Sequence, residues 1–195
     1  MDRRALRIAA AILIGVAALE TIPIVFAFRG LGHALLRPQP PAAVAGALAI
    51  VVAYVAYAAR VPGIRARIGT IGWITIPAVL LAVTAGITEE VIFRKVLMDA
   101  LAAHGENAVV QVAASAVAFG VAHAIWAIRG GWPALRGAVV ATTLLGAALA
   151  ILYLADGRLV VPCIEAHVAI DLILEPALVL FYVERALARR RGVIA

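Results

Sequence analysis

The stretch Leu80-Leu-Ala-Val-Thr-Ala-Gly-Ile-Thr-Glu89-Glu90-Val-Ile-Phe93-Arg94-Lys95-Val-Leu-Met98 places two adjacent glutamates inside an otherwise apolar segment. Moving an ionised carboxylate into hydrocarbon has a large free-energy cost, so two neighbouring carboxylates in such a segment require a reason. Ionisable residues within membrane segments mark functional sites by default, together with a partner of matching chemistry. His123 and His167 lie in two other apolar stretches and are the candidate partners.

The composition of the 195-residue chain is that of a membrane protein. Hydrophobic residues make up 65% of it and charged residues 14%, and the mean hydropathy is +1.06. A helix needs roughly 20 apolar residues to cross a bilayer, and several runs reach that length. We therefore predict an all-α fold, a polytopic bundle of transmembrane helices. The net charge of +6 is attributed to arginines facing anionic headgroups, so no nucleic-acid partner is expected.

Six apolar segments are long enough to be spans, and breaks rich in proline and glycine separate them. The predicted spans are Ile8–Phe28, Ala42–Ala59, Pro77–Ala103, Ala108–Ile128, Leu135–Ala155 and Leu159–Val183. The segment Ile68–Ile76 is predicted to be either an interfacial helix or the start of the third span. No linker is long enough to divide the chain, so residues 1–195 are predicted to form a single integral membrane domain.

The distribution of arginines predicts the orientation of the spans, because loops with excess Lys and Arg stay in the cytoplasm. The arginine-rich regions are Arg3–Arg7, Arg60–Arg67, Arg129–Arg136 and Arg185–Arg191. The first apolar run is longer than the roughly 7–15-residue core of a signal peptide, so we interpret it as a retained helix. We predict a multi-pass protein of the cell membrane with both termini in the cytoplasm.

The rise of an α-helix predicts the depth of each polar residue. At about 1.5 Å per residue, Glu89 lies about 22 Å from the turn at 104–107, and His123 lies about 24 Å from it. The two helices are antiparallel neighbours, so these side chains are expected at one level, in the cytoplasmic half. His167 and Asp171 lie about 14 Å and 20 Å beyond the preceding turn, and tilt can bring them to the same level.

Helical phase separates the two glutamates. Glu90 and Arg94 are four residues apart, with Glu in the favourable N-terminal place, so they can form an ion pair within the helix. Glu89 points about 100° away, at 3.6 residues per turn, and is left without an intrahelical partner. A purely structural network of these three residues is the alternative to a functional site.

Two further pairs share a helix face, because each pair is four residues apart: Phe119 with His123, and His167 with Asp171. A carboxylate beside a histidine can fix its tautomer and raise its basicity. A lone histidine in such a helix is more often a packing residue. Polar groups on three helices at compatible depths nevertheless favour one shared site.

These residues form three motifs in a fixed order, Glu89-Glu90-Val-Ile-Phe93-Arg94, Phe119-Gly-Val-Ala-His123 and His167-Val-Ala-Ile-Asp171. They resemble the Glu-Glu-x-x-x-Arg, Phe-x-x-x-His and His-x-x-x-Asn/Asp motifs of the CAAX-protease and bacteriocin-processing family of intramembrane proteases, also called the Abi family. Each motif is weak alone, and together they are specific. The resemblance covers about residues 80–180.

The resemblance implies a glutamate-type endopeptidase that cleaves a membrane-associated peptide, either prenylated or of leader type, within a helical fold whose cavity is open to water. By this resemblance Glu89 would activate the attacking water with the help of His123. His167 and Asp171 would stabilise the oxyanion. The residues that would support the site are Glu90, Arg94 and Phe119. The expected partners are a peptide or protein substrate and the lipid bilayer.

Asp171 departs from the prenyl-protein proteases of this family, which usually have Asn at this position. An amide can donate a hydrogen bond to an oxyanion, whereas an ionised carboxylate cannot. Asp171 must therefore be protonated, or it orients His167 instead. We favour the orienting role, and the departure weakens the case for a prenylated substrate.

A metal centre is the second open question. Glu89, His123 and His167 could ligate zinc with an open water position. Their spacing is not the His-Glu-x-x-His pattern of zinc proteases, and the family has been described both as metalloprotease and as glutamate protease. We favour a site without a metal or other cofactor, with zinc on these three residues as the alternative. The lone Cys163 permits neither an intramolecular disulfide nor a cysteine zinc site, and is expected to be a packing residue.

Two other classes of function compete with a peptidase. A catalytically silent scaffold or immunity protein of the same fold would bind a membrane peptide without cleaving it. A transporter would use intramembrane carboxylates and histidines as a proton relay, but the chain lacks the paired repeats or broken-helix symmetry typical of transporters. The three motifs favour the peptidase.

Overall fold

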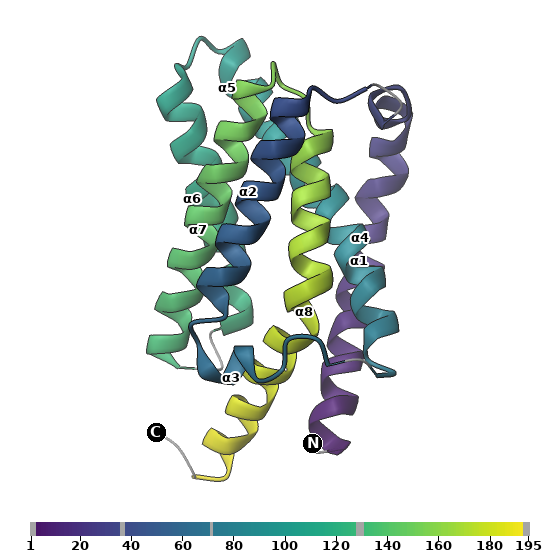
Figure 1. Ribbon diagram of the computed structural model, residues 1–195, viewed down its shortest axis with the longest axis vertical. Helices are drawn as coiled ribbons and strands as arrows, with labels where there is room; N and C mark the ends of the chain where they lie inside the picture. Colours follow the sequence, from purple (N-terminus) through teal and green to yellow (C-terminus); the bar gives the residue numbers. More distant parts are fainter. Residues whose placement is uncertain (1–2, 36–37, 71, 128–130, 193–195) are drawn as a thin grey trace.

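Helices make up nearly all of the computed structural model, which describes residues 3–35, 38–70, 72–127 and 131–192 (Figure 1). They are α1 (Arg3–Leu35), α2 (Pro41–Ala58), α3 (Pro62–Arg65), α4 (Thr75–Glu90), η1 (Val91–Val96), α5 (Leu97–Ala103), α6 (Ala108–Ala127), α7 (Trp132–Ala155) and α8 (Val161–Arg190). The described residues contain no strand, so the predicted all-α class is confirmed.

Within the residues that the structure describes, six helical stretches are long and apolar enough to cross a membrane, which agrees with the predicted number of spans. They are Arg3–Ile22, Pro41–Ala58, Thr75–Ala103, Ala108–Ile125, Trp132–Ala155 and Val161–Arg190. The last helix continues beyond the predicted end at Val183, because its final turns stay helical as they become rich in arginine. The predicted end of the fourth span, Ile128, and the neighbouring Arg129 lie outside the described residues.

The segment between the second and third spans is not the interfacial helix that was one of its two predictions. Residues 66–70 and 72–74 form turns and bends, and α4 begins at Thr75. Gly69 has a φ of +76°, a left-handed conformation that ends regular helix and that glycine adopts without strain. The alternative prediction, the start of the third span, holds only for Thr75 and Ile76. The short α3 precedes this segment at one end of the bundle (Figure 1).

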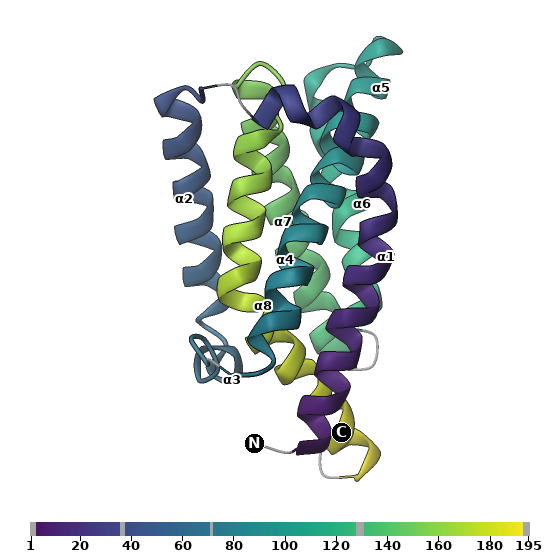
Figure 2. The same ribbon diagram turned by 90° about the vertical axis from the view of Figure 1, so that its right-hand side faces the viewer.

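The helices pack so that α8 contacts both sides of the bundle. It packs against α2 on one side and against α4 on the other, while α1 lies along α4 and α6 lies along α7 (Figures 1 and 2). Both termini lie at the same end, as an even number of spans requires. The cytoplasmic location of that end stays a prediction from the arginines.

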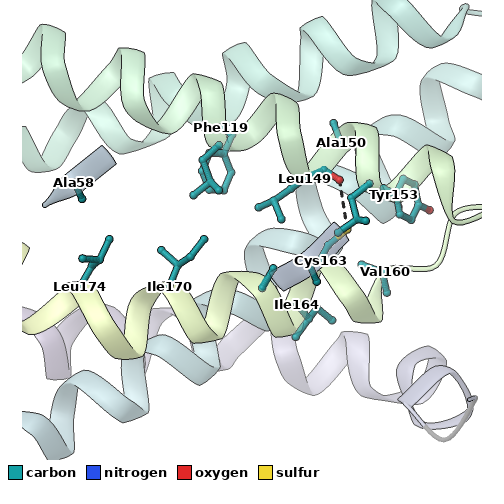
Figure 3. Packing of buried hydrophobic residues seen from close by; sticks show 14 of the residues in the cluster. Ala58, Phe119, Leu149, Ala150, Tyr153, Val160, Cys163, Ile164, Ile170 and Leu174 are labelled. Atoms are coloured by element: carbon teal, nitrogen blue, oxygen red, sulfur yellow. Dashed lines mark hydrogen bonds between the residues drawn. The ribbon is translucent and has the colours of Figure 1, made fainter. Parts of the chain in front are cut away.

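Two buried apolar clusters hold these helices together. One lies between α6, α7 and the first half of α8, and includes Phe119, Leu149 and Ile170 (Figure 3). The other joins α1, α4 and the later half of α8. Cys163 belongs to the first cluster, where it is fully buried and its Sγ lies 3.4 Å from the carbonyl oxygen of Leu149. Cys163 is therefore a packing residue, as expected.

The outer surface of the bundle carries the apolar side chains that a bilayer would cover. Large exposed examples on five helices are Leu19, Val52, Ile76, Val109 and Ile151. In water such a surface would promote association, whereas in lipid it faces hydrocarbon. The backbone polar groups of the spans are satisfied within helices, which is the condition for crossing a membrane. The chain is a multi-pass membrane protein.

Candidate active site

Four of the predicted site residues come together from three helices. Glu89 lies in the last turn of α4, His123 on α6, and His167 and Asp171 on α8. Glu89 Oε2 lies 3.6 Å from His123 Nε2, and Asp171 Oδ2 lies 3.4 Å from His167 Nε2. The common level predicted from the helical rise for Glu89 and His123 is therefore confirmed.

The Glu89 and His123 side chains face each other in a partly open position. They are 18% and 21% exposed, whereas most of their surroundings are buried. His123 Nδ1 lies 2.8 Å from the Phe119 carbonyl oxygen, which can only accept, so this contact assigns the proton to Nδ1. In the neutral ring Nε2 then carries the lone pair, and this atom faces Glu89. Within the part of the chain that the structure describes, Glu89 Oε2 has no hydrogen-bond donor.

Glu90 is completely buried, and its carboxylate contacts two other side chains. Its Oε2 lies 3.0 Å from Arg94 Nε, which confirms the predicted ion pair. Its Oε1 lies 2.8 Å from His167 Nδ1, a contact that the sequence analysis missed because it joins α4 to α8 across 77 positions. No spacing rule connects residues so far apart. Glu90 therefore links the first motif to the third.

Arg94 is the buried cation at the centre of the supporting contacts. Its Nη2 donates to the Gly146 carbonyl oxygen on α7 at 3.2 Å, and its guanidinium carbon lies 4.7 Å above the Phe119 ring. The Phe119 ring also contacts His123 and His167, with ring centroids 4.4 and 5.5 Å apart. Phe119 thus contacts one polar side chain from each of the three motifs.

Close packing of α6 on α7 makes the Arg94 contact possible. A Cβ added at Gly146 would lie 3.1 Å from the Ala116 Cα and 3.2 Å from the Phe119 Cβ. A side chain at this position would be in tighter contact than usual, so glycine favours this close approach of the helices. The approach puts the Gly146 carbonyl within reach of Arg94.

His167 is held more firmly by Glu90 than by Asp171. The 3.4 Å separation from Asp171 exceeds the usual range of an N–H···O hydrogen bond, whereas the 2.8 Å contact with Glu90 lies within it. The predicted proximity of His167 and Asp171 is present, but Asp171 makes the longer of the two contacts. His167 is also nearly inaccessible, with 3% of its side chain exposed.

The helix that carries the first motif is not regular. Directly after Glu90 the backbone widens into the π-helix η1, in which the N–H of Leu97 bonds to the carbonyl of Ile92, five residues earlier. Such π-bulges occur frequently at functional sites. The sequence predicted an uninterrupted α-helix here, because a π-turn has no sequence signature that helical periodicity reveals.

The donor set does not fit a zinc ion held by Glu89, His123 and His167. His167 Nδ1 bonds to Glu90 and its Nε2 lies 3.4 Å from Asp171, so both ring nitrogens have carboxylate neighbours other than Glu89. Among the residues that the structure describes, no three His, Cys, Asp or Glu side chains are grouped as metal ligands. We derive no chemical step through a metal.

The fold and the site define a class: polytopic helical membrane proteins with carboxylates and imidazoles gathered inside the bundle. A comparison with protein families matches the family described as type II CAAX prenyl endopeptidase, Rce1-like, over residues 71–173. These residues are just over half of the chain and contain all three motifs. The chain therefore belongs to this protease family, which confirms the resemblance. Comparisons with curated proteins and with solved structures give no match.

Proposed function

We propose that this protein is an intramembrane endopeptidase that hydrolyses a peptide bond of a membrane-associated peptide with water activated by Glu89. The observation that carries the proposal is the pairing of Glu89 Oε2 with His123 Nε2 at 3.6 Å in an otherwise apolar bundle. The two side chains are about one-fifth exposed, whereas Oε2 itself is buried and, among the described residues, has no hydrogen-bond partner. With its proton on Nδ1, His123 presents an acceptor, and an ionised Glu89 presents another. One water molecule can donate to both.

The chemistry follows from these two acceptors. Glu89 takes a proton from water while the water oxygen bonds to the carbonyl carbon of the substrate, and the carbonyl π electrons move onto its oxygen. When the tetrahedral intermediate collapses, the C–N bond breaks and the proton held by Glu89 passes to the leaving nitrogen. His123 keeps the water in line throughout. No covalent intermediate and no metal are needed.

His167 is the group that we assign to the oxyanion. Its Nδ1 is fixed by Glu90, whereas its Nε2 has only the long contact with Asp171. An Nε2–H can therefore exchange that contact for a bond to the developing negative charge, at little cost in hydrogen bonding. In this proposal Asp171 holds Nε2–H in place until substrate binds, and Arg94 holds Glu90.

The substrate class proposed is a peptide held at the membrane by a prenyl group or by an apolar leader segment. A site surrounded by apolar helices favours substrates that are already concentrated in the bilayer. Membership in the Rce1-like family supports the prenylated form. The carboxylate at Asp171, where the family's prenyl proteases usually carry Asn, supports including unprenylated leader peptides.

The test is cleavage of a library of prenylated and leader-type peptides in liposomes, comparing the parent chain with Glu89→Gln. Loss of a general base costs about 10²–10⁴-fold in rate, so cleavage by Glu89→Gln should fall by that factor while the variant stays folded and inserted. Glu165→Gln is the matched control, because Glu165 is exposed and bonds to Gln39, outside the site. Equal turnover by Glu89→Gln and the parent would overturn the proposal.

A further inference from the structure

Five Ser and Thr hydroxyls inside the spans donate to backbone carbonyl oxygens, and they do so in two different ways. Thr21, Thr84 and Thr142 each donate to a carbonyl oxygen four residues earlier in their own helix. This is the usual arrangement for Ser and Thr in a membrane helix, and it links nothing to anything else. Thr88 and Ser115 instead donate to a different helical element. They are also among the most buried polar side chains, at 2% and 0% exposed.

The two exceptional hydroxyls bracket the catalytic segment. Thr88, directly before Glu89, donates to the carbonyl oxygen of Glu20 on α1 at 2.8 Å. Ser115 on α6 donates to the carbonyl oxygen of Phe93, inside the π-helix, at 3.0 Å. The residues between these two anchors include both glutamates, and Arg94 follows directly.

Ser115 belongs to a stripe on α6 that follows the first motif. Ser115, Phe119 and His123 recur every four residues and therefore share one face of the helix. Ser115 bonds to the Phe93 carbonyl oxygen. The Phe119 ring lies beneath the Arg94 guanidinium, and His123 faces Glu89. Of these three contacts, only that of the Ser115 hydroxyl is a hydrogen bond.

We propose that Thr88 and Ser115 are positioning residues, which fix the segment 89–94 from its two neighbouring helices so that Glu89 faces His123 and Glu90 reaches His167. The inference rests on the function proposed above and adds residues outside the three motifs. A π-turn is a locally irregular part of the backbone, and its Phe93 carbonyl is held by Ser115 rather than by its own turn alone. Without the two hydroxyls the segment can shift along its neighbours.

The kinetic test compares variants that differ only in a hydroxyl. Displacement of a catalytic group by about 1 Å can cost 10²-fold, so Ser115→Ala and Thr88→Val should each lower kcat by about 10- to 100-fold, with KM changed less than threefold. Ser115→Thr and Thr88→Ser keep the hydroxyl and should restore most of the rate. Thr142→Val is the matched control, because it removes a hydroxyl bonded within its own helix, and it should leave kcat unchanged.

A second readout does not depend on activity. With Cys163→Ala as the background, spin labels are placed at Val96 and Val117, two exposed positions on η1 and α6. Ser115→Ala should shift or broaden the label-to-label distance, and Ser115→Thr and Thr142→Val should not. If Ser115→Ala does not fold, the shape-preserving Thr88→Val, with labels at Val96 and at Leu19 on α1, carries the test.

The two readouts separate the inference from the function on which it rests. Altered distances in a protein that cleaves no peptide would overturn the peptidase and leave the positioning role standing. Unaltered distances together with parental kcat in both hydroxyl-free variants would overturn the positioning role, whatever the parent cleaves. Equal loss of rate in the hydroxyl-free and hydroxyl-bearing variants would also overturn it, because packing rather than the hydrogen bond would then be responsible.

Discussion

Two polar clusters join helices of this apolar bundle, one around Asp99, whose side chain is one-third exposed, and one around the more buried Glu89. They differ in how their polar atoms are paired. Asp99 Oδ1 accepts from Tyr153 at 2.9 Å and from Arg158 at 2.7 Å. Its Oδ2 accepts from Lys95 at 3.1 Å. Arg158 donates further to Gln111 at 2.6 Å. The first three contacts have ordinary hydrogen-bond lengths, and the last is slightly shorter.

The cluster around Glu89 is paired much less completely. In the described part of the chain, buried atoms of three of its residues, Glu89, Glu90 and Arg94, have no partner that meets hydrogen-bond geometry. The contact of Glu90 with Arg94 is close as an ion pair but poorly directed as a hydrogen bond. The contacts of Glu89 with His123 and of Asp171 with His167 are 3.6 and 3.4 Å long.

This difference in pairing indicates that the Asp99 cluster stabilises the fold and that the Glu89 cluster carries out the reaction. Buried polar groups are normally paired, and a fully paired network makes a structure rigid. The Asp99 cluster joins α5, α6, α7 and the turn before α8, so we interpret it as a clasp at one end of the bundle. Groups without partners keep the capacity to bind water and substrate.

Glu90→Gln should destabilise the protein more than any other single change at the site. It leaves the completely buried Arg94 without a carboxylate and weakens the bond to His167. Breaking a buried ion pair by removing one partner costs about 3–5 kcal/mol, so the unfolding midpoint in detergent should drop accordingly, and cleavage should drop with it.

The control for that measurement is Glu184→Gln, which removes the partner of Arg67 from a pair that is about one-quarter exposed. Exposed ion pairs contribute about 0–1 kcal/mol, so its unfolding free energy should stay close to that of the parent. If both variants lose the same stability, Glu90 has no special structural role and the separation of the two glutamates is wrong.

Asp171→Ala should lower turnover by about 10²-fold, the effect of removing one oxyanion donor or its support. Asp171→Asn should retain much more activity, because an amide can hold His167 or donate to the oxyanion directly. The pair is measured on one cleavable peptide. Full activity of Asp171→Ala would make the third motif structural, reduce the catalytic set to Glu89 and His123, and favour the silent scaffold.

Asp99→Asn tests whether the Asp99 cluster stabilises the fold without taking part in the reaction. Asn can still accept from Tyr153 but loses its charge toward Arg158, so we expect a loss of about 1–2 kcal/mol in the free energy of unfolding. At temperatures where the variant is folded, kcat should equal that of the parent. A large fall in kcat at unchanged stability would mean that the Asp99 cluster takes part in the reaction.

The sequence predicted the features that depend on spacing along one helix. The six spans follow from the length of apolar runs, and the Glu90–Arg94 pair follows from a separation of four residues. The meeting of Glu89 with His123 follows from equal distances to a shared turn. Each of these depends on helical rise or period, which tertiary packing changes little.

The features that the sequence did not predict depend on how helices meet. The bond between Glu90 and His167 joins two segments that are far apart in the sequence. In the sequence, Thr88 and Ser115 look like ordinary helix residues, and their hydrogen bonds to other helices become visible only in the structure. The π-helix after Glu90 is a response of the backbone to its surroundings. Periodicity describes an isolated regular helix and contains none of this information.

Removal of metal should have the smallest effect of all. Protein dialysed extensively against a chelator should retain its rate of cleavage and contain less than one equivalent of zinc, because His167 Nδ1 is bonded to Glu90 and its Nε2 lies beside Asp171. A rate lost to the chelator and restored by zinc would contradict this and make Glu89, His123 and His167 ligands. The unpaired polar atoms of the site would then be metal-coordinating atoms. The incomplete pairing that distinguishes this site from the Asp99 cluster would then be explained by metal binding rather than by activation of water.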